Sequence, residues 1–258
     1  MHPGIIAQQT PDKPAYIMAD SGISVTFKQL NDGSNQGAQL FRKLGLQTGD
    51  HIAIMLENHP RFLQICWAAQ RAGLYYTAIS YRLQVDEVEY IVRDCNAKCF
   101  ITSLAQKDVA ALLLEKSGAM QNAYMLDGVI DGYQSWESAI AQQPATPIAD
   151  ESEGMDMLYS SGTTGRPKGI KVPLTGTSLG TPAPLFMLLQ ALYFTPGAEM
   201  RYLSPAPLYH AAPLRYNVNF LRTGSTCVIM EKFEPEHFLQ LVEKHRITHC
   251  QMVPTMFI

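Results

Sequence analysis

Long apolar runs are missing from this 258-residue sequence. Its greasiest stretch, PAPLFMLLQALYF at residues 182–194, is shorter than the ~20 residues that a membrane-spanning helix needs. We therefore predict no transmembrane segment and expect a buried helix there. The first residues, MHPGIIAQQTPDKP, also lack the charged segment and apolar run of a signal peptide, so we expect a cytoplasmic protein.

A strong bias toward either charge is absent as well. The chain has 20 Lys and Arg against 23 Asp and Glu, a formal net charge of −3. Nucleic-acid-binding proteins usually present a basic surface, so we predict no nucleic-acid partner. A homo-oligomer is possible, but no segment of the sequence marks an interface for one.

Cysteines are few, and their five positions do not form a pattern with histidine that is typical of zinc ligands. We predict free thiols in a reducing compartment and no metal ligands in this chain.

Strand-like and helical segments alternate after the N-terminal region. A hairpin is predicted around Asp20-Ser21-Gly22, followed by a helix over about 27–44. Strands are then predicted at 51–56, 74–80, 98–103 and 122–128, with helices at 60–73, 86–97 and 108–118. This alternation predicts an α/β fold with βαβ units and mostly parallel sheets covered by helices.

The pattern changes near the middle of the chain and then returns. Residues 131–154 read as one short helix and a proline-bearing linker, and residues 225–254 as strand, helix and strand. We expect a first α/β subdomain over 1–174 and an incomplete second one over 175–258. The last residues, MFI, are apolar and follow a strand-like run, which suggests that the natural chain continues past Ile258.

Between these parts lies SSGTTGRPKG, residues 160–169. We expect residues 155–159 and 169–172 to pair as strands on either side of it. The glycines permit positive φ, which lets backbone N–H groups form an anion-binding nest: Gly162, Gly165 and Gly169. Hydroxyl donors and cations add to it: Ser160, Ser161, Thr163, Thr164, Arg166 and Lys168. The loop therefore predicts an anionic ligand, and several phosphates would satisfy these donors best.

Two known phosphate loops do not fit this stretch. A Walker loop has a lysine directly after its second glycine and starts a helix there, whereas Arg166 follows Gly165 here and Pro167 prevents an ordinary helix. A dinucleotide G-x-G-x-x-G is absent from the stretch. From composition alone, a surface hairpin that binds nothing stays open.

The ordered string resembles the phosphate-binding signature of the adenylate-forming superfamily, S/T-S-G-S/T-T-G-x-P-K-G, at every position from 160 to 169. Residues 24–30 (SVTFKQL), 68–80 (AAQRAGLYYTAIS) and 204–214 (SPAPLYHAAPL) resemble further segments of its acyl-CoA synthetases, in the family's order. The resemblance implies the N-terminal part of the adenylate-forming synthetase fold.

It also implies a chemistry. Members convert ATP and a carboxylate to acyl-AMP and pyrophosphate, and then transfer the acyl group to coenzyme A. By position, Thr163, Thr164 and Lys168 would bind the β- and γ-phosphates, with Thr164 and Lys168 catalytic. His210 would lie beside the acyl carboxylate and the adenylate, as a further catalytic residue, and Tyr209 near the acyl channel. The remaining residues of the ATP loop would be Ser160, Ser161, Gly162 and Gly165.

Later parts of the family pattern are absent: a magnesium-binding Glu, an Asp for the ribose, a hinge, and a small C-terminal domain with a catalytic Lys. We expect them beyond Ile258, and we expect these residues alone to bind MgATP weakly and to be inactive. The apolar segment 182–194 and the Ala-Ala-Pro after His210 favour an apolar carboxylic acid.

Other readings stay open. An amino-acid adenylation domain normally carries an Asp in the segment that corresponds to 204–214, and none is there. A non-catalytic ligase-like binding module would keep the loop without the chemistry. A kinase-like phosphotransferase would give ADP in place of AMP.

Overall fold

The computed structural model describes residues 1–117, 122–160, 167–181, 183–195 and 198–257. Two compact units emerge from it. The first unit comprises Met1–Asn31, Asn58–Leu63 and Gly180–Ile258, and the second unit comprises Asp32–Glu57 and Gln64–Leu179. The first unit therefore combines residues from both ends of the chain, whereas the division expected near residue 174 follows sequence order.

A six-stranded sheet forms the centre of the second unit, and every neighbouring pair of its strands is parallel. Along the sheet the order is β7-β6-β5-β3-β4-β8. Its strands are β3 (His51–Met55), β4 (Tyr75–Ala78), β5 (Ala97–Ser103), β6 (Ala123–Leu126), β7 (Gln134–Ser135) and β8 (Met155–Asp156). All residues of β3 and β4 are buried, as expected for parallel strands covered on both faces. The predicted parallel α/β sheet is confirmed.

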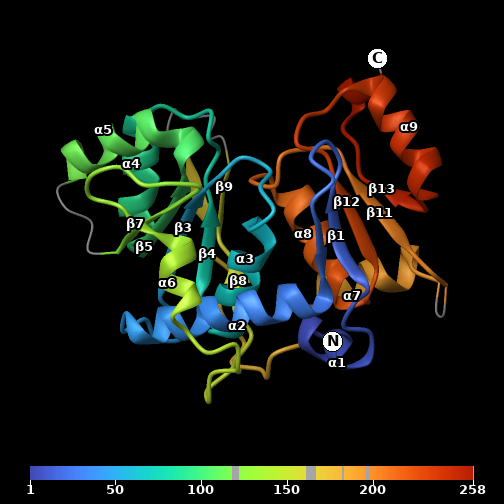
Figure 1. Ribbon diagram of the computed structural model, residues 1–258, viewed down its shortest axis with the longest axis horizontal. Coiled ribbons are helices and arrows are strands. Elements are labelled where there is room, and N and C mark those ends of the chain that lie inside the picture. Colours follow the sequence, from blue (N-terminus) through green and yellow to red (C-terminus); the bar gives the residue numbers. More distant parts are fainter. Residues whose placement is uncertain (118–121, 161–166, 182, 196–197, 258) are drawn as a thin grey trace. The chain divides into compact units, whose positions relative to one another are not determined.

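Helices cover both faces of this sheet (Figure 1). The short 3-10 turn η1 (Leu104–Gln106) precedes α5. One face packs against α4 (Val85–Asp94) and α5 (Lys107–Ser117). On the other lie the later part of α2 (Phe27–Lys43), α3 (Phe62–Arg71) and α6 (Trp136–Ala141). Trp136 packs edge-on against Tyr124 of β6 and lies 5.9 Å from Phe41 of α2 between ring centres.

The first unit has its own sheet, of five strands in the order β13-β11-β12-β1-β2. They are β1 (Pro14–Met18), β2 (Ser24–Thr26), β11 (Arg201–Ser204), β12 (Thr226–Ile229) and β13 (His249–Cys250). Figure 1 shows β1, near the start of the chain, beside β12, and the two are parallel. β1 and β2 form the predicted hairpin, which leads directly into α2.

Helices also cover both faces of the second sheet. Phe238 and Leu241 of α9 (Pro235–His245) pack on one face, while Phe220 of α8 (Ala211–Arg222) stacks on Tyr202 of β11 on the other. The remaining helices of the first unit are α1 (Pro3–Gln9), α7 (Pro184–Tyr193) and the 3-10 turn η2 (Pro254–Met256). Neither β11 nor α8 is predicted from the sequence, although both flank the candidate residues Tyr209 and His210.

The apolar segment 182–194 forms a helix, α7, but the expectation that it is buried is wrong. Leu185, Met187 and Leu192 are 52%, 57% and 63% exposed, and of the described helix only Phe186 is buried. Apart from Gln190, the side chains of this helix are apolar or aromatic, so its composition does not indicate which side packs. No helix in the described part of the chain is long and apolar enough to cross a membrane.

Candidate functional site

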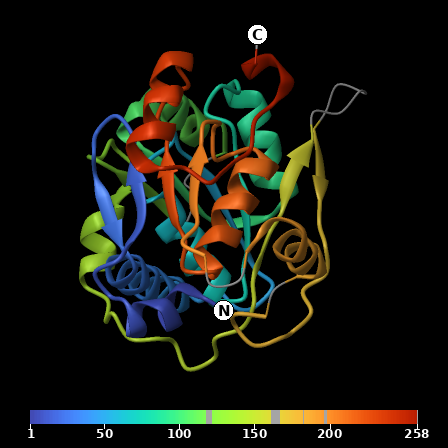
Figure 2. The ribbon, with the colours of Figure 1, turned by 90° about the vertical axis from the view of Figure 1, so that its right-hand side faces the viewer.

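The two ends of the loop signature, Ser160 and Lys168–Gly169, belong to a two-stranded hairpin of the second unit, formed by β9 (Leu158–Ser160) and β10 (Lys168–Ile170) (Figure 2). The predicted pairing holds for Leu158 and Tyr159, which pair with Ile170 and Gly169, and it extends to Ser160 and Lys168. Met155 and Asp156 instead join the large sheet beside β4, because the chain passes from one sheet to the other at Met157.

Two of the predicted phosphate-binding residues lie opposite each other on this hairpin. Ser160 pairs with Lys168 in the antiparallel register, both are exposed, and the Ser160 hydroxyl lies 3.5 Å from the Lys168 carbonyl oxygen. Directly opposed residues present their side chains on the same face. Six further candidates lie outside the described residues, so their roles stay predictions: Ser161, Gly162, Thr163, Thr164, Gly165 and Arg166.

Gly169 serves a different purpose from the one predicted. Its φ is not in the positive range. A Cβ at this position would lie 2.5 Å from the Met157 methyl and 2.9 Å from the Tyr159 ring. The glycine therefore makes room for these two side chains.

Tyr75 contacts the chain on both sides of the loop. Its backbone pairs with Met155 where β4 lies beside β8, before the loop. Its hydroxyl donates to the Val172 carbonyl (2.8 Å) and accepts from the Leu174 N–H (3.1 Å), after the loop. One buried residue thus contacts, through its backbone and its side chain respectively, the segments before Ser160 and after Lys168.

His51 and Lys171 pack against the Tyr75 ring. The His51 ring stacks on Tyr75, with ring centres 4.6 Å apart, and Lys171 Nζ lies 2.9 Å from His51 Nε2 and 4.5 Å from the centre of the Tyr75 ring. Burial, and then the Lys171 charge, lower the pKa of His51 to about 4. The ring is therefore neutral at neutral pH, and since an ammonium can only donate, Nε2 accepts and Nδ1 carries the proton.

The segment before β8 is fixed by α3. Gln70 donates to the Glu153 carboxylate and to the Gly154 carbonyl (2.7 Å), and it accepts from the Tyr76 hydroxyl (2.9 Å). The Gly154 N–H donates to the Gln70 carbonyl (2.7 Å). A Cβ on Gly154 would lie 2.5 Å from the Leu74 carbonyl oxygen, so only glycine fits there.

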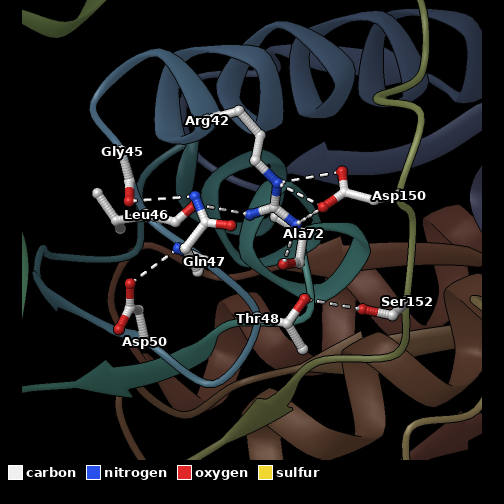
Figure 3. Close-up of polar contacts among 9 residues, drawn as sticks. All are labelled: Arg42, Gly45, Leu46, Gln47, Thr48, Asp50, Ala72, Asp150 and Ser152. Atoms are coloured by element: carbon white, nitrogen blue, oxygen red, sulfur yellow. Dashed lines mark hydrogen bonds and ion pairs between the residues drawn. The ribbon is translucent and has the colours of Figure 1, made fainter.

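Farther back, the linker before this segment is bound to α2. The Arg42 guanidinium donates from Nε to both Asp150 oxygens (3.1 and 3.0 Å) and from its other nitrogens to the carbonyls of Leu46 (3.0 Å) and Ala72 (2.8 Å) (Figure 3). The Ala72 carbonyl directly follows α3, and the Leu46 carbonyl lies in the turn after α2. Arg42 thus joins the linker at Asp150 to the segments that follow these two helices.

The candidate acid-binding residues lie in the first unit. Tyr209 and His210 connect β11 to α8, and their ring centres are 4.4 Å apart. Tyr209 is buried, whereas His210 is exposed and forms the N-cap position of α8 without a side-chain cap. The loop follows the carboxyl ends of parallel strands, where ligands usually bind in α/β sheets.

The structure thus brings together Ser160 with Lys168, and Tyr209 with His210. Each pair belongs to a different unit. Sequence reasoning missed the buried residues that fix each pair, namely Tyr75 for the first and Asn58 for the second. The two consecutive tyrosines of β4 were an available signal for Tyr75, although they do not distinguish it from Tyr76. For Asn58 there was none, because its partners lie far away in the sequence.

Comparison with known proteins agrees with this geometry. A model of the AMP-binding enzyme family matches residues 6–258. The chain is 29% identical over 238 residues to feruloyl-CoA synthase of Amycolatopsis sp and 25% identical over 250 residues to the long-chain-fatty-acid–CoA ligase FadD13 of Mycobacterium tuberculosis. These alignments cover 92% and 97% of this chain but only 45% and 48% of those proteins, so it spans about half their length.

Solved structures share the fold. A putative long-chain-fatty-acid CoA ligase from Rhodopseudomonas palustris superposes with a TM-score of 0.84 at 21% identity, over 98% of this chain and 62% of that one. The N-terminal domain of FACL13 from Mycobacterium tuberculosis gives 0.81 at 23% identity, with the same coverage. The expected fold, the N-terminal part of an adenylate-forming synthetase, is confirmed. With its family match extending over nearly the whole sequence, the chain belongs to the AMP-binding enzyme family.

Proposed function

We propose that this chain is the ATP-binding portion of an acyl-CoA ligase. The ligase activates an apolar carboxylic acid as acyl-AMP, releases pyrophosphate and transfers the acyl group to coenzyme A in the cytoplasm. The observation that carries the proposal is the complete SSGTTGRPKG signature in a chain that belongs to the AMP-binding enzymes, with its ends, Ser160 and Lys168, paired on a hairpin.

The described end of the hairpin fits a phosphate group. Lys168 and Ser160 present an ammonium and a hydroxyl side by side toward solvent, and no carboxylate of the described residues forms an ion pair with Lys168. When ATP is bound, it supplies the electrophilic α-phosphorus and the pyrophosphate leaving group. Fixed donors such as these neutralise the charge that develops as the carboxylate attacks, and positioning supplies most of the remaining effect.

In the first unit, we assign the binding of the acid substrate to Tyr209 and His210. The exposed His210 imidazole can donate a hydrogen bond to a carboxylate, and the buried Tyr209 ring beside it offers an apolar surface. An apolar acid is favoured over an amino acid because residues 204–214 contain no Asp that could bind an amino group. We further propose that the magnesium ligand and the catalytic lysine belong to a part of the natural protein outside these residues. The 258 residues alone would then bind MgATP weakly without turnover.

Carboxylate-dependent ATP–pyrophosphate exchange tests this proposal. The natural gene product that carries these residues is assayed with short, long, aromatic and steroid-like acids and with amino acids. We expect exchange with one class of apolar acid. In Lys168→Ala, loss of a charge-assisted phosphate contact of about 1.5–3 kcal/mol should lower the exchange efficiency about tenfold to a hundredfold.

Lys244→Ala is the matched control, since Lys244 is an exposed lysine in the last turn of α9. It should leave exchange unchanged. Exchange with no acid, although ATP binds, would favour the non-catalytic binding module instead. Exchange that is driven by amino acids alone would favour an amino-acid adenylation domain.

A further inference from the structure

One buried side chain, that of Asn58, forms hydrogen bonds that fix the loop carrying Tyr209 and His210. Asn58 is 7% exposed and belongs to the first unit although it follows β3 in the sequence. Its Nδ2 donates to the carbonyls of Met230 (2.7 Å) and Ala206 (3.3 Å). Its Oδ1 accepts from the Leu208 N–H (2.8 Å).

These partners define the path of the loop. Met230 directly follows β12, and Ala206 and Leu208 lie between β11 and Tyr209. Leu208 is fully buried and Ala206 is 6% exposed, so their backbone groups cannot be satisfied by bulk water. No strand or helix pairs the Leu208 N–H, and the Asn58 amide supplies its partner.

The chemistry of the contact requires an amide. Both donors of the Asn58 side chain face carbonyl oxygens, and its oxygen faces an N–H. A carboxylate of the same shape would place a negatively charged oxygen against two carbonyls. An aliphatic side chain would leave three buried backbone groups unpaired.

We infer that Asn58 is a positioning residue for the acid substrate: by fixing residues 206–208 it determines where Tyr209 and His210 meet the carboxylate. The inference rests on the proposed function, in which these two residues contact the acid. Lys168 lies in the other unit, so Asn58 should affect the acid and not ATP.

The test is Asn58→Asp in the natural gene product, with KM for the acid and for MgATP measured by pyrophosphate exchange at several pH values. At about pH 8 we expect KM for the acid to rise about tenfold, because buried acceptors lose their donors, while KM for MgATP changes less than about twofold. As the pH falls the defect should shrink, since the introduced carboxyl, once protonated, can donate to Met230 and still accept from Leu208.

Asn35→Asp is the matched control. Asn35 is 1% exposed in the second unit, and its Nδ2 donates to the Ala145 carbonyl (2.8 Å). It should change neither KM value. If Asn58→Asp does not fold, Asn58→Ser replaces it: its uncharged hydroxyl should give a rise in KM for the acid of about threefold that is independent of pH.

The possible outcomes distinguish a failure of the proposed function from a failure of the inference about Asn58. An active wild type with unchanged KM for the acid in the folded Asn58 variants would overturn the inference alone. Equal increases in both KM values at every pH would overturn it as well, since they would indicate a general structural defect. A wild type without exchange on any acid would overturn the proposed function, and the inference with it.

Discussion

Lys168 and His210 are both exposed, yet the backbone that carries each is fixed by a different kind of contact. In the second unit, the segments on both sides of the loop are secured by strand pairing and by Tyr75, whose hydroxyl bonds two backbone groups after the loop. In the first unit, one buried amide, Asn58, bonds three backbone groups around the loop.

The difference teaches where preorganisation comes from in this chain. A functional side chain can be exposed and still be well placed if its backbone is fixed by buried groups beneath it. Around Lys168 these groups are spread over two strands and a helix. Around His210 they converge on one residue, Asn58, so a single substitution should have a more selective effect there.

The largest effect on the second unit is expected from Gly154→Ala. The added methyl would lie 2.5 Å from the Leu74 carbonyl oxygen and 2.8 Å from that of Ala69, and backbone atoms cannot easily give way. We expect the free energy of unfolding to fall by about 2–3 kcal/mol, measured by urea denaturation.

Gly33→Ala in α2 is the control for this change. Its methyl would meet only the flexible end of the Gln64 side chain, at 3.0 Å. Alanine favours a helix by roughly 0.5–1 kcal/mol over glycine, so this variant should be neutral or more stable than the wild type. Equal destabilisation in both variants would contradict the role given to the close approach at Gly154.

A smaller effect is expected from Tyr75→Phe, which removes the hydroxyl but keeps the ring. The loss of its hydrogen bonds should lower the free energy of unfolding by about 1 kcal/mol. Since the segment after Lys168 loses its attachment, KM for MgATP should rise about threefold while KM for the acid stays unchanged. This is the reverse of the pattern expected for Asn58→Asp.

Tyr133→Phe provides the comparison, because the Tyr133 hydroxyl also donates to one buried carbonyl, that of Ala110 (3.1 Å), but away from the loop. It should show a similar loss of stability with normal KM values. If Tyr75→Phe also left both KM values normal, Tyr75 would contribute to stability alone. That result would contradict the role given to Tyr75 in placing Lys168.

Much of the second unit could be predicted from the sequence because its strands are short, apolar and separated by helices with clear periodicity. The loop signature likewise made Lys168 a candidate phosphate-binding residue from ten consecutive residues, and that role stays a prediction. What could not be predicted depends on contacts between distant segments. The pairing of β1 with β12, the switch of Met155 and Asp156 to the large sheet, and the Asn58 contacts all join residues far apart in the chain.

Composition also misled in places. The segment 182–194 is apolar enough for a core helix, yet most of α7 is exposed in the described chain. Gly169 stands in a glycine-rich loop, yet its role is to give room to Met157 and Tyr159. In both cases the residue type was read correctly, but the packing that it serves depends on neighbours that a local pattern does not identify.

A further expected effect is a pH dependence at His51. Its pKa is lowered from 6.5 to about 4 in the folded chain, so between these values the unfolded state binds a proton that the folded state does not. Stability should therefore fall as the pH decreases through this range. Between about pH 7 and about pH 5, the free energy of unfolding of the wild type should decrease more than that of His51→Gln. Urea denaturation at both pH values would show this, and parallel decreases would contradict the assignment of a buried neutral imidazole.

The products formed from ATP test the central claim most directly. The natural gene product is incubated with its best acid, MgATP labelled at the α-phosphate, and no coenzyme A. The account predicts labelled AMP, free or as acyl-AMP, in an amount that depends on the acid and is strongly reduced in Lys168→Ala. Labelled ADP formed in an acid-dependent reaction would contradict adenylation and indicate phosphoryl transfer instead.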